Sequence, residues 1–163
     1  MTQTREATHT PEPRCKITAA RWPEDTGVVL TGEHTMTLDG VSFHRHANGG
    51  GWVANTAHVA DTAFVGLFAW VSGMAQVYDK ALVYGEARVC GEAQVCDKAQ
   101  VYDKALVYGE ALVYGEAQVC GMVQVYDKAQ VCDKAQVCDK ARVCGEAQVY
   151  GEARVCGKQK ISG

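Results

Sequence analysis

The residues with the most chemical potential in this chain are its eight cysteines and five histidines. Seven of the cysteines recur in one slot of a repeated sequence, where tyrosine stands in the other copies. The chain has no C-x-x-C pair and no histidine pair at the spacing of a zinc site. Exchange between tyrosine and cysteine is typical of drift among duplicated units. We therefore predict free structural thiols, no bound metal and no cofactor.

The histidines are mostly outside the repeat. His34, His44 and His46 precede it, and the spacing of His44 and His46 would place both on one face of a strand. Such a group could hold a metal ion, but surface decoration is the commoner outcome. Within the repeat the only histidine is His58.

The repeat has a period of six residues. Valine occupies every sixth position from Val53 to Val155, Ile161 keeps the phase, and this makes nineteen hits in succession. Alanine usually follows four residues later, so the unit is A-x-V-[YC]-[GD]-[EK]. A helix would spread these valines around its circumference, because residues six apart do not share a helical face. One continuous strand would put Val and the Asp or Gly of each unit on the same face. The pattern therefore predicts short strands separated by bends at the Gly-Glu or Asp-Lys pairs.

This pattern resembles the hexapeptide-repeat family, and more narrowly the tandem A-x-V-x-G-x proteins of bacteria and their phages. The lead-in at residues 48–57 is also similar to theirs. The resemblance covers residues 51–163 and implies a left-handed parallel β-helix, in which three hexads make one triangular coil. We therefore expect an all-β fold, a triangular β-solenoid with Val and Ala inside and a small N-terminal cap.

Residues 18 apart should stack in columns on the outer faces of such a solenoid. One column holds Trp52, Trp70 and Arg88, while His58 and Phe68 stand at neighbouring positions. Exposed aromatic side chains are enriched in interfaces. These five residues form the candidate binding site, for a protein or a small anionic ligand. The alternative is that the aromatic side chains only pack beneath the cap.

A second column stacks three cysteines, Cys120, Cys138 and Cys156. Strand spacing would hold them about 4.8 Å apart. Parallel side chains at that spacing suit a disulfide poorly, because its Cβ atoms prefer about 3.8 Å. We expect these thiols to stay free, as in a reducing cytoplasm.

Residues 1–50 lack the repeat and contain all three prolines. We expect a polar tail over residues 1–25, then short strands beginning near Gly27, Thr35 and Val41, the last two joined by an Asp39–Gly40 turn. Because a β-helix must cover its first coil, this segment is expected to be a cap. After Val155 the sequence is too short to cover the last coil, which predicts homo-oligomer formation through the C-terminal coil.

Composition narrows the function classes. The net charge of −3 argues against binding of long nucleic acid, and no apolar run reaches the length of a membrane span. The N-terminus is too polar for a signal peptide, which predicts a cytoplasmic protein.

Four functions stay open. The first is a non-enzymatic scaffold or binding protein, and the resemblance adds a phage or mobile-element origin. The second is a trimeric acyltransferase-like enzyme, which in this family uses a histidine and a protruding loop; the unbroken hexads argue against it. Ice binding is the third, although its usual threonine columns are missing. The fourth is a small inhibitor or sponge that acts on a host system.

Overall fold

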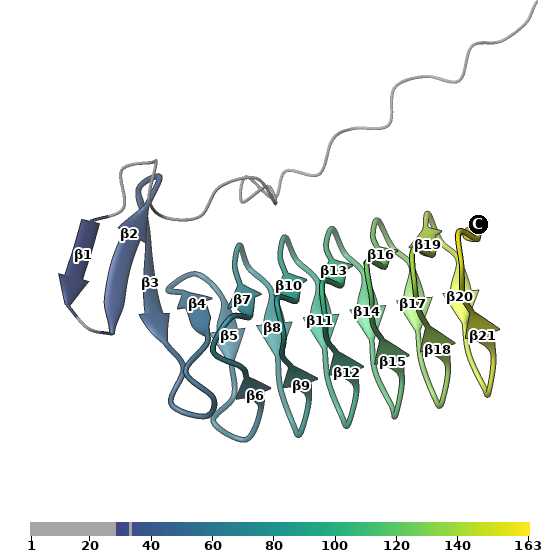
Figure 1. The fold of residues 1–163 in the computed structure, drawn as a ribbon, viewed down its shortest axis with the longest axis horizontal. Helices are drawn as coiled ribbons and strands as arrows, with labels where there is room; N and C mark the ends of the chain where they lie inside the picture. Colours follow the sequence, from purple (N-terminus) through teal and green to yellow (C-terminus); the bar gives the residue numbers. More distant parts are fainter. Residues whose placement is uncertain (1–28, 33) are drawn as a thin grey trace, which may run out of the picture.

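The computed structural model describes residues 29–32 and 34–163, and its repeat region is a β-solenoid. Each short strand pairs in parallel with the equivalent strand of the next coil, as Val77 does with Val95. Three sheets run along the rod, so that each coil contributes one strand to each sheet. Figure 1 shows the coils as a regular row between the strands β1–β3 at one end and the C-terminus at the other. The predicted all-β solenoid, with a coil made of three hexads, is confirmed.

The first sheet has ten strands and the other two have six each. The first sheet contains β1 (Val29–Gly32), β2 (Thr35–Leu38), β3 (Val41–Arg45), β4 (Trp52–Ala54), β7 (Trp70–Val71), β10 (Arg88–Val89), β13 (Leu106–Val107), β16 (Gln124–Val125), β19 (Arg142–Cys144) and β22 (Lys160–Ser162). The second contains β5 (His58–Val59), β8 (Gln76–Val77), β11 (Gln94–Val95), β14 (Leu112–Val113), β17 (Gln130–Val131) and β20 (Gln148–Val149). The third contains β6 (Phe64–Val65), β9 (Leu82–Val83), β12 (Gln100–Val101), β15 (Gln118–Val119), β18 (Gln136–Val137) and β21 (Arg154–Val155).

The interior of the rod is built from valine and alanine. Val95 and Val113 are fully buried, as are the alanines that precede them in the hexads. Between coils, the N–H of the residue before a valine donates to a carbonyl of the next coil, in most cases that of an alanine, as from Gln76 to Ala93 at 2.9 Å. Small inward side chains and a continuous backbone ladder therefore hold the coils together.

The bends between the strands explain why the fifth position of the repeat unit is either glycine or aspartate. Most residues in this slot have positive φ, for example +67° at Gly85 and +60° at Asp97, a region that these two residue types tolerate better than most. Aspartate adds a bond, because its carboxylate accepts from the backbone N–H of the glycine one coil above. Five such pairs occur, at 2.9–3.2 Å: Asp97–Gly115, Asp103–Gly121, Asp127–Gly145, Asp133–Gly151 and Asp139–Gly157.

The strands before the repeat extend the first sheet. β1 pairs antiparallel with β2, and β2 pairs antiparallel with β3. β3 in turn pairs antiparallel with β4 of the first coil. The turn between β2 and β3 lies at Asp39 and Gly40, both with positive φ, as the sequence predicts. The segment that follows covers β6: the Asn48 carbonyl accepts from the Val65 N–H at 3.0 Å, and the Gly51 N–H donates to the Val65 carbonyl at 2.8 Å.

The three strands of the first coil are covered to different extents by the segment that precedes the repeat. β5 is the end strand of the second sheet, and its Val59 is only half-buried. At the other end of the rod, Ala153 is exposed and Ile161 is half-buried. Inward-facing apolar groups are therefore partly open to solvent at both ends of the described solenoid.

The part of the chain that the structure describes contains no helix with the length and apolarity needed to cross a membrane.

Replacing Val101 by Asp should disrupt the coils on either side of β12, because Val101 is fully buried and a carboxylate there would have no partner among valines and alanines. We expect a loss of about 3 kcal/mol or more in the free energy of unfolding. Chemical denaturation followed by circular dichroism measures it. Gln100→Asp is the matched control, since Gln100 lies on the same strand and points outward; an equal loss in both variants would contradict the assignment of the two faces.

Candidate binding surface at the junction of cap and solenoid

Four side chains line up across four neighbouring strands of the first sheet. Arg45 on β3 pairs with Trp52 on β4, Trp52 pairs with Trp70 on β7, and Trp70 pairs with Arg88 on β10. We call this set the Arg–Trp–Trp–Arg row. It places two aromatic surfaces between two guanidinium-bearing side chains, a combination that suits anionic and planar groups.

The tryptophans of this row also pack against the cap. The ring centroids of Trp52 and Trp70 lie 6.1 Å apart, and Trp70 meets Phe43 edge-on at 5.5 Å. Phe43, Met36 and Ala54 form a small apolar cluster on which both tryptophans rest. Both tryptophans nevertheless stay only partly buried, so packing beneath the cap uses only part of their surface.

Arg45 is fixed in position by the backbone. Its Nη1 donates to the carbonyls of Gly50 at 2.8 Å and Leu67 at 3.0 Å. Its guanidinium carbon lies 3.8 Å from the centroid of the Trp52 ring, a cation–π contact. Burial lowers the pKa of Arg45, but an arginine remains charged at neutral pH. The row therefore has a permanent positive charge held over an aromatic face.

The structure brings together only part of the predicted site. Trp52, Trp70 and Arg88 share the row, whereas His58 lies on β5 of the second sheet and is exposed. Phe68 stands at the corner before β7 with 57% of its surface exposed, beside Leu67 at 53%. Arg45 is the member that sequence reasoning missed, because its place depends on the antiparallel register of β3 on β4.

The described histidines ahead of the repeat, His34, His44 and His46, do not converge. The Nδ1 of His44 bonds to the Asn55 carboxamide oxygen at 2.9 Å, and the Nδ1 of His46 bonds to the Asn48 carbonyl at 3.1 Å. His46 is buried and its Nε2 has no hydrogen-bond partner. Within the described residues, no group of three close metal-ligating atoms includes a histidine.

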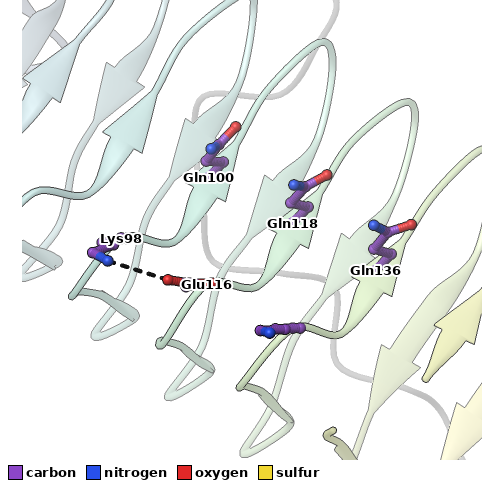
Figure 2. A pocket seen from close by; sticks show the side chains of 6 residues that line it. Lys98, Gln100, Glu116, Gln118 and Gln136 are labelled. Carbon is purple, nitrogen blue, oxygen red and sulfur yellow. Dashed lines mark hydrogen bonds and ion pairs between the residues drawn. The ribbon is translucent and has the colours of Figure 1, made fainter. Parts of the chain in front are cut away.

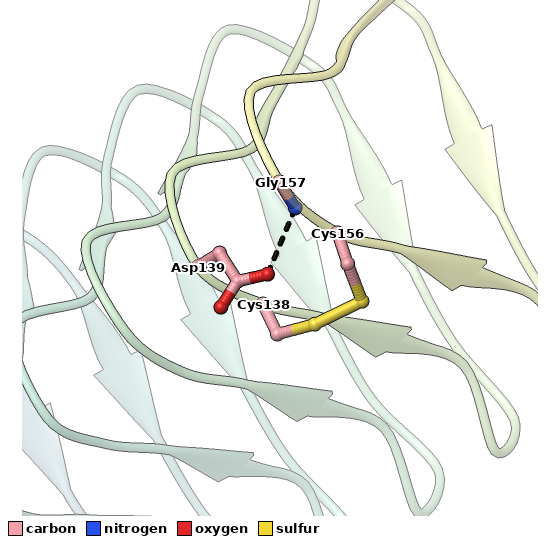
Figure 3. Close-up of a disulfide and its surroundings, with 4 residues drawn as sticks. All are labelled: Cys138, Asp139, Cys156 and Gly157. Atoms are coloured by element: carbon pink, nitrogen blue, oxygen red, sulfur yellow. Dashed lines mark hydrogen bonds between the residues drawn. A yellow bond between two sulfur atoms is a disulfide. The ribbon is translucent and has the colours of Figure 1, made fainter.

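The thiol prediction is wrong for one pair. Cys138 and Cys156 form a disulfide, with Cα atoms 4.7 Å apart (Figure 3). That separation lies within the range that disulfides span, because the two sulfurs turn toward each other and close the distance that parallel side chains would leave. The carboxylate of Asp139 lies beside the pair, and its Oδ2 accepts from the Gly157 N–H at 2.9 Å. Both sulfurs are bonded to each other, so this group of three donors offers no thiolate to a metal in this state.

Five other cysteines remain thiols: Cys90, Cys96, Cys120, Cys132 and Cys144. Cys15 lies outside the described residues. They stand in columns with tyrosine. Where two tyrosines are neighbours their rings stack, with centroids 5.0 Å apart for Tyr84–Tyr102 and for Tyr108–Tyr126. These columns are the ladders that a simple stacking model predicts.

A shallow groove follows the corner before the third sheet and has a volume of about 380 Å³. Gln100, Gln118 and Gln136 lie in parallel on successive strands along it, and Lys98 pairs with Glu116 at 3.1 Å (Figure 2). Both charged side chains are more than half exposed, so this ion pair contributes little to stability. The polar groups repeat once per coil and do not converge on one point.

No family model, curated protein or solved structure matches this chain.

The tyrosines that touch a cysteine should titrate late. A hydrogen bond to the cysteine of the next coil, together with burial, raises the pKa to about 12 for Tyr78, Tyr102, Tyr114 and Tyr126. In the unfolded chain a tyrosine titrates near 10. Between these values the folded state holds more protons than the unfolded state, so stability is complete below about pH 10 and falls as the pH rises toward 12.

Ultraviolet absorbance of the phenolate measures this effect. The native protein should show tyrosine midpoints above those of the same protein in guanidinium chloride. A native titration that coincides with the denatured one would contradict the tyrosine–cysteine contacts.

Proposed function

We propose that this protein is a non-enzymatic scaffold of the hexapeptide-repeat type that presents flat faces to a partner bearing an anionic group. The observation that carries the proposal is the Arg–Trp–Trp–Arg row where the cap joins the first sheet of the solenoid. The resemblance to hexapeptide-repeat proteins supports the scaffold part, because the repeat itself is a structural unit.

The row fits an anion for three reasons. Arg45 is held by two backbone carbonyls and remains charged, so little conformational freedom is lost on binding. The partly buried tryptophans offer apolar surface beside the charge. Arg88 supplies a second guanidinium two strands along the row from Trp52. Because the two arginines stand three strands apart, a carboxylate or phosphate contacts one of them while an adjacent flat apolar group lies on the tryptophans.

Tryptophan fluorescence tests this binding with two probes, a glutamate peptide for an acidic protein segment and inorganic pyrophosphate for a small anion. We expect a saturable, salt-sensitive change with at least one of them. Arg88→Gln should weaken the affinity for the probe about tenfold, since one charge-assisted contact is lost. Arg142→Gln is the matched control, because Arg142 belongs to the same column of the first sheet three coils away. The proposal fails if neither probe binds, or if both variants lose affinity equally.

We also propose that the scaffold self-associates through its C-terminal coil. In each earlier coil, the N–H of the residue before the valine donates to a carbonyl of the next coil, as from Gln136 to Ala153 at 2.9 Å. In the terminal coil, the donor that corresponds to Gln136 is the N–H of Arg154. Exposed Ala153 and half-buried Ile161 lie at the same end. A second copy that supplies strand edges and apolar contact would cover both features.

Arg154→Pro should block this assembly without unfolding the monomer, because proline is tolerated in an edge strand whose N–H is not used in the ladder. Sedimentation velocity at high micromolar concentration should show a dimer or larger species for the original chain and a monomer for the variant. Gln136→Pro is the contrast, since the Gln136 N–H is bonded, and it should lower the solenoid's thermal stability. A monodisperse monomer of the original chain at that concentration would refute self-association.

A further inference from the structure

The described solenoid stacks cysteine upon cysteine in one column only. Cys120, Cys138 and Cys156 follow one another there on three successive coils. In the other two columns, tyrosine separates the cysteines: Cys90, Tyr108, Tyr126 and Cys144 in one, and Tyr78, Cys96, Tyr114, Cys132 and Tyr150 in the other. Only this column can therefore form a disulfide between neighbouring coils.

Cys138 has an equivalent cysteine on either side. The Cys120 N–H donates to the Val137 carbonyl at 2.9 Å, and the Cys138 N–H donates to the Val155 carbonyl at the same distance. The strand registers are also the same, with Val119 opposite Val137 and Val137 opposite Val155. The step from Cys120 to Cys138 thus repeats the step from Cys138 to Cys156, whose Cα atoms are 4.7 Å apart. Cys120 and Cys156 are two coils apart, roughly 9.6 Å at the usual strand spacing, which is too far for a direct bond.

We propose that this cysteine column is a thiol–disulfide exchange site, in which one disulfide occupies either of two adjacent positions and the third cysteine remains a thiol. In the structure the disulfide lies between Cys138 and Cys156, and Cys120 is free. The inference concerns the third sheet and does not depend on anion binding or on self-association.

The exchange step needs no oxidant. The Cys120 thiol gives its proton to solvent, and its thiolate attacks the Sγ of Cys138. A bond forms between Cys120 and Cys138 while the bond between Cys138 and Cys156 breaks. Cys156 leaves as a thiolate and takes a proton from solvent. One disulfide and one thiol are present before and after, so the step is redox-neutral.

The two positions of the disulfide join different pairs of coils. A bond between Cys138 and Cys156 ties β21 of the terminal coil to β18, whereas a bond between Cys120 and Cys138 ties β18 to β15. In the second state Cys156 is a partly exposed thiol on the terminal coil, and its thiolate can attack a small disulfide of the glutathione class, which forms a mixed disulfide and releases one small thiol. Because a solenoid is stabilised coil by coil, moving the bond inward releases the terminal coil selectively.

Disulfide mapping of single variants tests the proposal. The full chain carries Cys15→Ser, is incubated with oxidised glutathione, alkylated and digested, and its linked peptides are identified by mass spectrometry. The starting chain should contain the Cys138–Cys156 bond. Cys156→Ser should form the Cys120–Cys138 bond under the same conditions, and Cys120→Ser should keep the Cys138–Cys156 bond. Cys138→Ser should form no bond between Cys120 and Cys156, only mixed disulfides with glutathione.

A second measurement tests whether the position of the bond controls the stability of the terminal coil. Amide hydrogen exchange of residues 150–158 should be about tenfold faster, or more, in Cys156→Ser than in Cys120→Ser, while residues 90–100 exchange equally in both. Circular dichroism of the reduced variants checks that serine leaves the fold unchanged. The proposal is overturned if Cys156→Ser leaves Cys120 and Cys138 unlinked, if Cys138→Ser links Cys120 to Cys156, or if the terminal amides exchange equally in both variants.

Discussion

The stacking register of the coils is the constraint on which the rest of this structure depends. Each residue must lie above its equivalent in the preceding coil, because the N–H groups of one coil meet the carbonyls of the next at a fixed offset along the chain. A shift by one residue would move valine outward and bring a charged corner residue into a core of valine and alanine. The period of six residues is therefore a condition of folding, and the repeats keep it without interruption from Val53 to Ile161.

This register makes each outward side chain a neighbour of its own equivalents. Tyrosine above tyrosine stacks, as Tyr84 and Tyr102 do with nearly parallel rings. Aspartate below glycine finds a backbone N–H, and lysine beside glutamate forms an exposed pair, as Lys98 and Glu116 do. Cysteine next to cysteine can form a disulfide, as Cys138 and Cys156 do. The chemistry of each column can thus be read from the residues that share it.

The solenoid could be predicted from the sequence, but the disulfide between two of its coils could not. The valine period fixes which residues stack, and the three columns that it predicts are the three sheets observed. The same reasoning placed Cys138 beside Cys156 but treated their side chains as parallel rods, whereas free rotation about the Cα–Cβ bond lets two sulfurs meet across a 4.7 Å Cα separation.

Arg45 was missed for another reason. The Asp39–Gly40 turn could be read from the sequence, but the pairing of β3 with β4 depends on how the segment around Asn48 crosses β6, a contact between residues with no common period. Local signals predict a hairpin, and long-range contacts select its register on the next strand.

A regular solenoid also limits where selective chemistry can arise. Where a column repeats one residue type it offers the same group on successive coils, as Gln100, Gln118 and Gln136 do, and identical groups in a line cannot converge on a single ligand atom (Figure 2). Distinct groups meet only where a column changes residue type or where chain from outside the repeat joins it. Both conditions hold at the Arg–Trp–Trp–Arg row, since Arg45 comes from the cap and Trp70 gives way to Arg88. The first condition alone holds at Cys120, where tyrosine gives way to cysteine in the third column. The departures from the repeat are therefore the places where this rod can recognise or react, and the repeat between them keeps those places at fixed distances.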